Sequence, residues 1–241
     1  MAVKYKRVLI KLSGEALKGN NTDSSIFSSE ILHSIAEAVK EVKELGVEIS
    51  IVIGAGNIWR GKSAKTIGIE PTTADYMGML GTIINALALQ SCLELHGVQC
   101  RVLSAINVAE VSEPYIRRRA LRHLEKGRVV IFAGGTGNPF FTTDTAAALR
   151  AKEMNCDAIL MAKNGTEGVL SADPKIDKNA TLLKDLSYRD MLMKNLKVMD
   201  NTAASLLSES DIELRVFNIN DLSNLKRIML GENIGTTIRK E

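Results

Sequence analysis

The chain has 241 residues, of which 45% are hydrophobic and 4% aromatic, so it can form a substantial and mainly aliphatic core. Its formal net charge of +3 is too small to indicate a nucleic-acid-binding protein. We find no apolar run that approaches about 18 residues, and the N-terminal apolar stretch is too short for a signal peptide. We therefore expect a cytoplasmic protein without a membrane span.

The cysteines and histidines argue against disulfides and protein-held metals. Cys92, Cys100 and Cys156 are odd in number and lie in apolar surroundings, which favours reduced core residues. The three histidines are not paired at ligand spacing, which argues against a histidine-based zinc site.

Predicted strands and helices alternate along the chain. Apolar, β-rich runs predict strands at residues 7–12, 48–53, 101–103, 128–132, 158–161 and 214–217. Helical spacing predicts helices at residues 29–45, 75–95, 116–126 and 145–154, and the second of these is apolar on nearly every face. This order predicts an α/β protein with a mainly parallel sheet that is covered by helices on both faces.

Ligands of such sheets bind at the carboxyl ends of the strands. The candidate loops therefore follow Leu12, Ile53, Phe132 and Met161, and each contains glycine. In the first loop, Lys11 and Gly14 place an ammonium and free backbone amides where both can face one anion, although a lysine before an ordinary turn fits the same residues.

The second loop contains a misleading motif. Residues 56–63 spell the P-loop pattern G-x-x-x-x-G-K-S directly after a strand. A P-loop continues from its Lys-Ser into a helix, whereas Gly68 and Pro71 interrupt this segment, and a strand ending in a magnesium-binding Asp is hard to find. We reject the P-loop, but the glycines and Arg60 still indicate phosphate binding.

The third loop, GGTGNPFFTTD at residues 134–144, is the most informative segment of the chain. Its glycines allow the backbone to pass close to a ligand, and Pro139 stiffens the turn. Its Asn and Thr side chains supply neutral donors and acceptors, and Asp144 places a carboxylate at a helix start. These features favour a small polar ligand over the alternative, a plain connection in which Thr143 is the helix N-cap. The fourth loop, 162–174, suits a purine nucleotide, but many surface turns share its composition.

Together the loops resemble one family. KLSGEAL at 11–17, G-x-G-N-x-W-R-G at 54–61, TADYMGM at 73–79, GTGNPFFTTD at 135–144 and GVLSADP at 168–174 occur in the order and spacing of the bacterial uridylate kinases, in the amino acid kinase superfamily. The resemblance covers essentially the whole chain. It implies a single domain over residues 1–241 with a three-layer αβα sandwich, and reversible transfer of the γ-phosphate of ATP to UMP in pyrimidine nucleotide (CTP/UTP) biosynthesis.

The resemblance also implies roles for individual residues. Lys11, Arg60 and Asp144 would be catalytic, with Mg²⁺ carried mainly by ATP and no metal held by the protein itself. The residues implied for ATP are Lys11, Leu12, Ser13, Gly14, Gly56, Arg60, Asn164, Leu170 and Asp173. Those implied for UMP are Ala55, Asp75, Thr136, Gly137, Asn138, Pro139, Phe140, Phe141, Thr142 and Thr143. The family further implies a homohexamer, inhibition by UTP, and neither nucleic acid nor membrane as partners.

The charges agree with this assignment. Lys11, Arg60, Mg²⁺ and backbone amides would neutralise the repulsion between ATP and UMP and stabilise the transferring phosphoryl group. No general base is needed, because the phosphate of UMP is already an anion. We therefore expect Asp144 to orient Lys11 or a magnesium-bound water.

Three positions depart from the family pattern. Ala55 stands in a run that is often all glycine, which is tolerable only if its φ is negative. Leu170 replaces the usual Tyr or Phe, and residues 19–26 lack a segment that in many relatives contributes to activation by GTP.

Two alternatives compete with this interpretation. One is a kinase of the same superfamily that phosphorylates a carboxylate or carbamate, although such a small substrate does not need so long a loop at 136–143. The other is a nucleotide or oxyanion binder without catalysis, which would have no use for Lys11, Arg60, Asp144 and Asp173 together.

Overall fold

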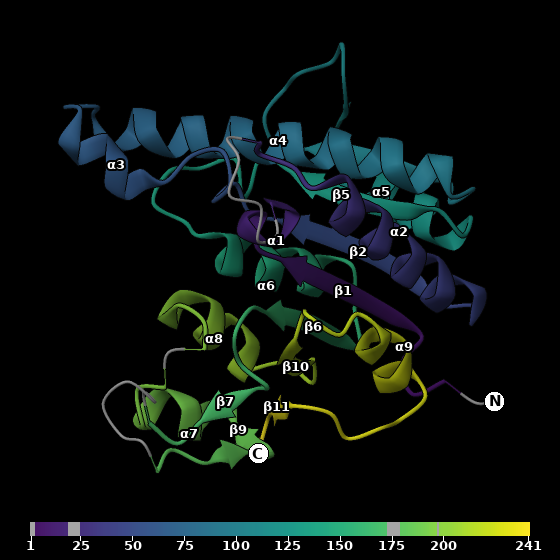
Figure 1. Ribbon diagram of the computed structural model, residues 1–241, viewed down its shortest axis with the longest axis vertical. Helices are drawn as coiled ribbons and strands as arrows, with labels where there is room; N and C mark the ends of the chain where they lie inside the picture. Colours follow the sequence, from purple (N-terminus) through teal and green to yellow (C-terminus); the bar gives the residue numbers. More distant parts are fainter. Residues whose placement is uncertain (1–2, 19–24, 173–178, 197) are drawn as a thin grey trace.

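The computed structural model describes residues 3–18, 25–172, 179–196 and 198–241 (Figure 1). Its strands are β1 (Arg7–Leu12), β2 (Glu48–Ile53), β3 (Cys100–Ser104), β4 (Glu113–Pro114), β5 (Val129–Ala133), β6 (Ala158–Lys163), β7 (Val169–Leu170), β8 (Leu182–Leu183), β9 (Asp185–Ser187), β10 (Glu213–Asn218) and β11 (Thr236–Arg239). Its helices are α1 (Gly14–Lys18), α2 (Ser29–Glu44), α3 (Gly61–Thr66), α4 (Pro71–Leu95), α5 (Arg117–Glu125), α6 (Thr143–Glu153), α7 (Tyr188–Met193), α8 (Asn201–Ser208) and α9 (Ser223–Met229).

A nine-stranded sheet runs through the molecule in the order β4-β3-β5-β2-β1-β6-β10-β11-β9. All its pairings are parallel except that between β10 and β11. The parallel centre was predicted from the apolar runs. The short strands near the edges, β4, β9 and β11, were not, because a strand of two to four residues carries too little periodicity to be recognised.

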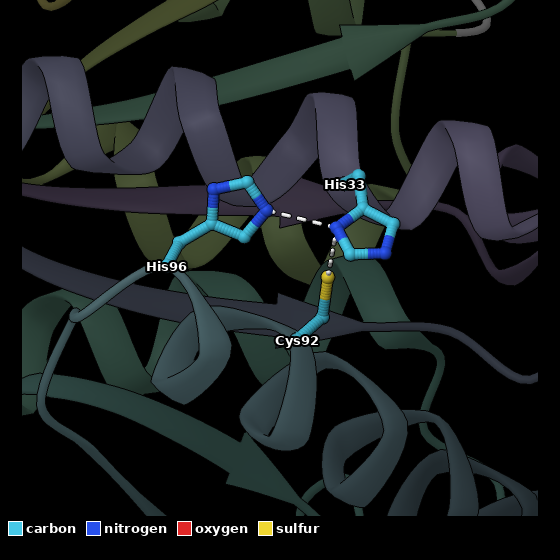
Figure 2. A group of neighbouring side chains, drawn as sticks. All are labelled: His33, Cys92 and His96. Atoms are coloured by element: carbon cyan, nitrogen blue, oxygen red, sulfur yellow. Dashed lines mark hydrogen bonds between the residues drawn. The ribbon is translucent and has the colours of Figure 1, made fainter.

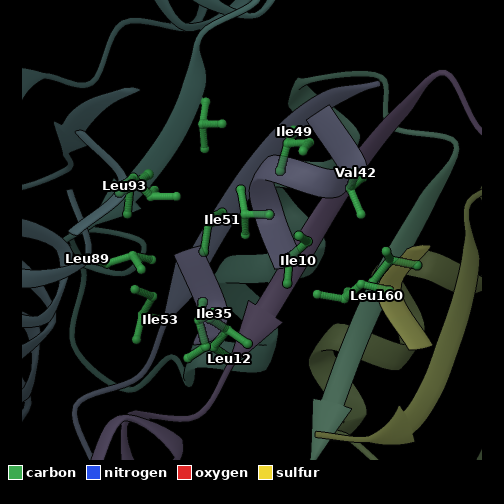
Figure 3. Close-up of a cluster of buried hydrophobic side chains, with 14 of the residues drawn as sticks. Ile10, Leu12, Ile35, Val42, Ile49, Ile51, Ile53, Leu89, Leu93 and Leu160 are labelled. Atoms are coloured by element: carbon green, nitrogen blue, oxygen red, sulfur yellow. The ribbon is translucent and has the colours of Figure 1, made fainter. Parts of the chain in front are cut away.

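Each face of the sheet has its own apolar core, as alternation along a strand requires. In β1, Val8, Ile10 and Leu12 belong to the core beneath α1, α2, α4 and α9, whereas Leu9 belongs to the core beneath α5, α6, α7 and α8. Figure 3 shows the first of these cores, where Ile35 of α2 and Leu89 of α4 meet the strands. The predicted layers of helix, sheet and helix are therefore confirmed.

The long helix α4 begins at Pro71, four residues earlier than predicted. Glu70 is its N-cap and accepts a hydrogen bond from the backbone N–H of Thr73, while Pro71 occupies the first turn, where its missing N–H is not needed. Tyr76, Leu80 and Ile84 form an exposed apolar stripe at four-residue spacing, so no described residue covers this outer face of α4.

The expectation about apolar runs was wrong for this helix. In the described part of the chain, α4 is long and apolar enough to cross a membrane, by length and composition alone. Half of its apolar window is buried inside the fold, however, because Ile83, Ala86, Leu89 and Leu93 pack against the sheet. The helix therefore serves as a core helix in this structure.

Candidate active site

The four predicted loops lie side by side at one edge of the sheet. They follow β5, β2, β1 and β6, which are consecutive in the sheet order and mutually parallel. The carboxyl ends of parallel strands share an edge, so the loops converge as predicted.

Gly14 allows the first and second loops to touch. A Cβ at this position would lie 2.5 Å from Asn57 Oδ1, 2.5 Å from the Gly54 carbonyl oxygen and 2.6 Å from the Gly56 nitrogen. Real Cβ atoms essentially never approach other atoms so closely. The absence of a side chain at Gly14 therefore sets the spacing between the two loops.

A buried asparagine of α4 fixes the second loop by hydrogen bonds. Asn85 is fully buried, and its Nδ2 donates to the Gly54 carbonyl at 2.7 Å and to Asn57 Oδ1 at 2.8 Å. Asn57 Nδ2 in turn donates to Asn85 Oδ1 at 3.0 Å. Sequence analysis did not single out Asn85, although an amide within an otherwise apolar helix is a signal that a buried partner exists.

Ala55 fits the second loop for two reasons. The non-glycine residues with positive φ in the described part of the chain are Phe140, Asn155 and Asn195, so the condition set for Ala55 is met. Its methyl group faces Gly81 of α4, where an added Cβ would lie only 2.9 Å from the Ala55 Cβ. The lack of a side chain at Gly81 therefore makes room for the methyl of Ala55.

The second and third loops enclose a cleft of about 280 Å³ with the N-terminal half of α4. Of the residues predicted to bind UMP, Ala55, Asp75, Phe141, Thr142 and Thr143 line this cleft, together with Gly56. Phe140 joins them through its backbone N–H, which donates to Asp75 Oδ2 at 2.7 Å. Phe140 has a φ of 70° and a side chain that is 76% exposed, so this hydrogen bond holds a strained turn beside the cleft.

The other residues predicted to bind UMP, 136–139, do not line the cleft. Thr136 Oγ1 instead closes a local turn with the backbone of Asn138, at 3.2 Å. The N-cap of α6 is Thr142, whose hydroxyl accepts from the backbone N–H groups of Asp144 and Thr145. Thr143, the N-cap considered from sequence, leaves its side chain in the cleft.

Asp200 braces this turn from another part of the chain. Its carboxylate accepts hydrogen bonds from the hydroxyl groups of Thr142 and Thr145, and it also caps α8 through the backbone N–H of Ala203. Partial burial acts to raise the pKa of Asp200, but these hydrogen bonds outweigh the burial and lower the pKa from its ordinary value. Its position next to a helix start was the only sequence signal for this role.

A lysine contacts a carboxylate, with a second lysine nearby, where the first, third and fourth loops converge. Lys11 Nζ lies 2.7 Å from Asp144 Oδ1, and both side chains are largely buried. Oδ1 makes no aligned hydrogen bond to any described residue, so the contact is one of charge. Lys163 lies at the end of β6, where burial lowers the pKa of its ammonium. The charges of Asp144 and Lys11 also act on this ammonium, in opposite directions. Sequence analysis missed Lys163, although, like Lys11, it is a lysine at the end of a buried strand.

Arg60 stands at the outer side of the same edge. Its Nη2 lies 2.7 Å from Glu15 Oε1, and both side chains are more than half exposed. The helix that follows, α3, has six residues and gives way to α4 at Pro71. The lysine-serine pair lies within this short helix, which ends at Thr66, as the interruption by Gly68 and Pro71 predicted, and no long P-loop helix follows in this described segment.

The residues predicted for the purine nucleotide are less closely grouped. Asn164 is exposed and lines a hollow that also includes Glu15 and Asn220. Leu170 is partly buried and pairs with Leu182 in a separate two-stranded ribbon of β7 and β8. Asp173, like most of residues 19–26, lies outside the described residues.

Cations, glycines and a carboxylate at one edge of a parallel sheet define an α/β protein that holds phosphate-bearing ligands without a P-loop. The sequence model of the amino acid kinase family matches residues 6–218, and the chain belongs to this family.

The relatives extend along the whole chain. A uridylate kinase from Pediococcus pentosaceus is 53% identical over 239 residues, which cover 99% of this chain and 98% of the relative. The crystal structure of a UMP kinase from Bacillus anthracis has a TM-score of 0.95 at 47% identity and covers 98% of this chain and 97% of its own. A UMP kinase structure from Ureaplasma parvum has a TM-score of 0.91 at 39% identity, with 98% and 100% covered. The resemblance seen in the motifs is confirmed.

Proposed function

We propose that this protein is a UMP kinase that reversibly transfers the γ-phosphate of ATP to UMP, giving ADP and UDP for pyrimidine nucleotide biosynthesis. The observation that carries the proposal is the group of Lys11, Asp144 and Lys163 beside the cleft that Asp75 and Thr143 line. Cations at this junction face the point where two anionic nucleotides would meet. The whole chain, residues 1–241, would act as one domain, since one sheet connects β4 to β9.

The reaction requires no side-chain nucleophile. A phosphate oxygen of UMP attacks the γ-phosphorus, the bond between that phosphorus and the β,γ-bridging oxygen breaks, and ADP leaves with the electron pair. The attacking oxygen is already anionic, so no proton has to be removed. The protein therefore has to position the two nucleotides and stabilise negative charge.

Lys11 would neutralise charge on the transferring group, and Asp144 would hold its ammonium in place. Lys163 is close enough for its charge to act on both residues, and it is anchored by donation to the carbonyl of Val198. When nucleotides bind, the guanidinium of Arg60 would leave Glu15 and contact a phosphate oxygen instead. The Arg60 side chain is exposed enough to make this change. The amides around Gly14 and Gly56 would complete the phosphate site together with Ser13 and Leu12.

The two nucleotides would occupy opposite sides of this junction. The cleft between α4 and the third loop would take UMP, with Asp75 at the ribose. Residues 136–143 would enclose the uridine and its phosphate, and of these, residues 141–143 line the cleft in this structure. Asn164, Leu170 and Asp173 would line the adenosine site. The first of these sides is the better formed in this structure, because Asp75 already fastens the third loop at Phe140.

A kinase that uses ATP requires a divalent metal in general, and we propose Mg²⁺. The donor set fits such an ion, because Asp144 Oδ1 is buried and has no aligned hydrogen-bond partner among the described residues. Mg²⁺ binds oxygen and keeps most of its waters, so Asp144 would contact one of those waters. When bound, the ion would neutralise charge on the phosphates.

A homohexamer in the cytoplasm is the assembly we propose, with UTP as an inhibitor that occupies the UMP cleft. The exposed stripe of Tyr76, Leu80 and Ile84 supports a subunit contact along α4, because an apolar row of this kind is otherwise left facing water.

The test is a panel assay with the purified protein, ATP and Mg²⁺, offering UMP, CMP, dUMP, AMP, GMP and small carboxylates and carbamates as acceptors. We expect turnover confined to UMP and its close pyrimidine analogues, with UDP as the product from UMP. Phosphorylation of a carboxylate or carbamate would instead place the chain among the other kinases of its family.

A lysine variant separates an enzyme from a binder. Lys11→Met should lose turnover far more than it loses affinity for UMP. Lys226→Met is a matched control, because Lys226 forms an exposed surface pair with Glu41 and should be dispensable. Binding of nucleotides without turnover of any monophosphate by the unmodified protein would refute the proposal and favour a binder.

A further inference from the structure

A cluster of nitrogen and sulfur ligands lies at the opposite end of α4 from Asp75 (Figure 2). His33 comes from α2, Cys92 from the last turn of α4, and His96 is the C-cap of α4. One ligand atom from each of the three lies within 4.8 Å of the other two. Cys92 and His96 lie four residues apart along one helix, but the third ligand could not be found from spacing, because 59 residues separate His33 from Cys92.

The separations within the cluster are close to those around a tetrahedral metal. His33 Nδ1 lies 3.6 Å from Cys92 Sγ and 2.8 Å from His96 Nε2. Zinc bonds of about 2.0 Å to nitrogen and 2.3 Å to sulfur place tetrahedral ligand atoms roughly 3.3–3.6 Å apart. The distance between nitrogen and sulfur already fits, and the two rings need to separate by only a few tenths of an ångström.

A carboxylate orients one of the rings. Glu37 lies one turn after His33 on α2, and its Oε2 is 2.9 Å from His96 Nδ1. When Nδ1–H donates to Glu37, Nε2 of His96 carries the free lone pair that points into the cluster (Figure 2). Metal-bound histidines usually have such a carboxylate or carbonyl on the second ring nitrogen.

The cluster is separate from the proposed phosphoryl-transfer site. From Asp75 to Cys92 the helix rises about 26 Å, at 1.5 Å per residue. Thiolate and imidazole are also the wrong ligands for Mg²⁺, and they favour zinc or a similar borderline-soft ion. The surroundings are accessible, because His33 is exposed while Cys92 is buried beneath it.

We propose that His33 Nδ1, Cys92 Sγ and His96 Nε2 bind one zinc-class divalent ion per chain, with a water as the fourth ligand and Glu37 as the positioning residue. The ion would fasten the start of α2 to the end of α4. Binding releases the thiol proton of Cys92 to solvent, and the proton on His33 Nδ1 moves to Nε2 through water. Without metal, the same groups form the hydrogen-bonded cluster described above.

Cobalt is the spectroscopic probe for this site. Titration of the metal-stripped, full-length protein with Co²⁺ should give a thiolate-to-cobalt charge-transfer band and the strong visible bands of a four-coordinate site. The bands should saturate at one ion per chain and disappear when Zn²⁺ is added. The unfolding temperature should rise with Zn²⁺ concentration, because the ion binds only the folded arrangement.

Single variants assign the ligands. His33→Gln, at an exposed position, should abolish the stoichiometric band, and Cys92→Ser should remove its charge-transfer component. Glu37→Gln should weaken binding by about 10- to 100-fold while the band keeps its shape. His123→Gln and Cys100→Ser are the matched controls, because they change the remaining histidine and a second buried cysteine outside the cluster, and both should bind as the unmodified protein does.

Two results would overturn the proposal. One is a protein that binds Co²⁺ without a thiolate band, and the other is His33→Gln with unchanged affinity for Zn²⁺. Neither result would bear on UMP kinase activity, because the cluster contains no residue of the proposed active site.

Discussion

Substitution of Gly14 by alanine tests the packing between the first two active-site loops. The added methyl group would meet three atoms at 2.5–2.6 Å, and two of them, the Gly54 oxygen and the Gly56 nitrogen, belong to the backbone. To restore an ordinary contact of 3.4 Å, the loops would have to move apart by about 0.9 Å. The second loop resists this movement, because Asn85 and the carbonyl of Leu12 both hold Gly54.

We expect two consequences of this substitution. Overpacking of this kind costs about 1–3 kcal/mol, which should lower the unfolding temperature by roughly 2–12 °C in a chain of this size. A displacement near 1 Å at the reacting groups should lower turnover about 100-fold. The assays are thermal unfolding, followed by circular dichroism, and UDP formation at saturating ATP and UMP.

Gly46→Ala is the control for a simple loss of stability. Gly46 has a φ of +82°, so alanine there is strained, but no atom of the described residues lies within 4 Å of the added methyl group. This variant should lose about 1–2 kcal/mol and keep its turnover. If Gly14→Ala retained as much turnover as Gly46→Ala, the argument from loop spacing would be wrong.

Four further substitutions test individual side chains. Asp144→Asn should lower kcat by about 10²- to 10³-fold at saturating Mg²⁺ with little change in unfolding temperature, and near-full turnover would refute its role beside Lys11. Asp75→Asn should raise the KM for UMP about tenfold or more, with a smaller effect on kcat. The reason is that the proposed hydrogen bond between the Asp75 carboxylate and the ribose of UMP, worth about 1.5–3 kcal/mol, would be weakened. An unchanged KM would remove Asp75 from the UMP site. Lys163→Met should lose turnover without losing stability, because burial lowers the pKa of the ammonium. The stability of the unmodified protein should accordingly rise relative to this variant as pH increases through the lowered pKa towards 10.5, which urea unfolding between neutral and alkaline pH would measure. Asp200→Ala should cost about 1–3 kcal/mol at pH 7. Because the pKa of Asp200 is lowered in the fold, this difference should be complete above the ordinary value of 3.8 and shrink as pH falls through the lowered pKa, and a difference that persisted at lower pH would contradict the assignment.

The sequence by itself determined the parallel centre of the fold and the edge at which the site lies. Short, β-branched apolar runs such as residues 48–53, followed by glycine, favour buried strands, and their glycine-containing ends meet when the strands are parallel. The start of α4 was also readable, because Glu70 and Pro71 form an ordinary N-terminal signal that the apolar pattern obscured.

Only the tertiary structure decided which distant side chains meet. The contact between Lys11 and Asp144 was one of two roles expected for Asp144, and the structure shows it. By contrast, Asp200 reaches Thr142 across 58 residues, and Lys163 joins the same group from β6, without any expectation from the sequence. His33 and Cys92 meet because α2 and α4 cover the same face of the sheet. The hydrophobic periodicity that identifies a helix or strand is contained in a window of a few residues, so the local elements could be predicted. Which distant side chains come into contact depends on strand order and helix packing, which the sequence pattern does not contain.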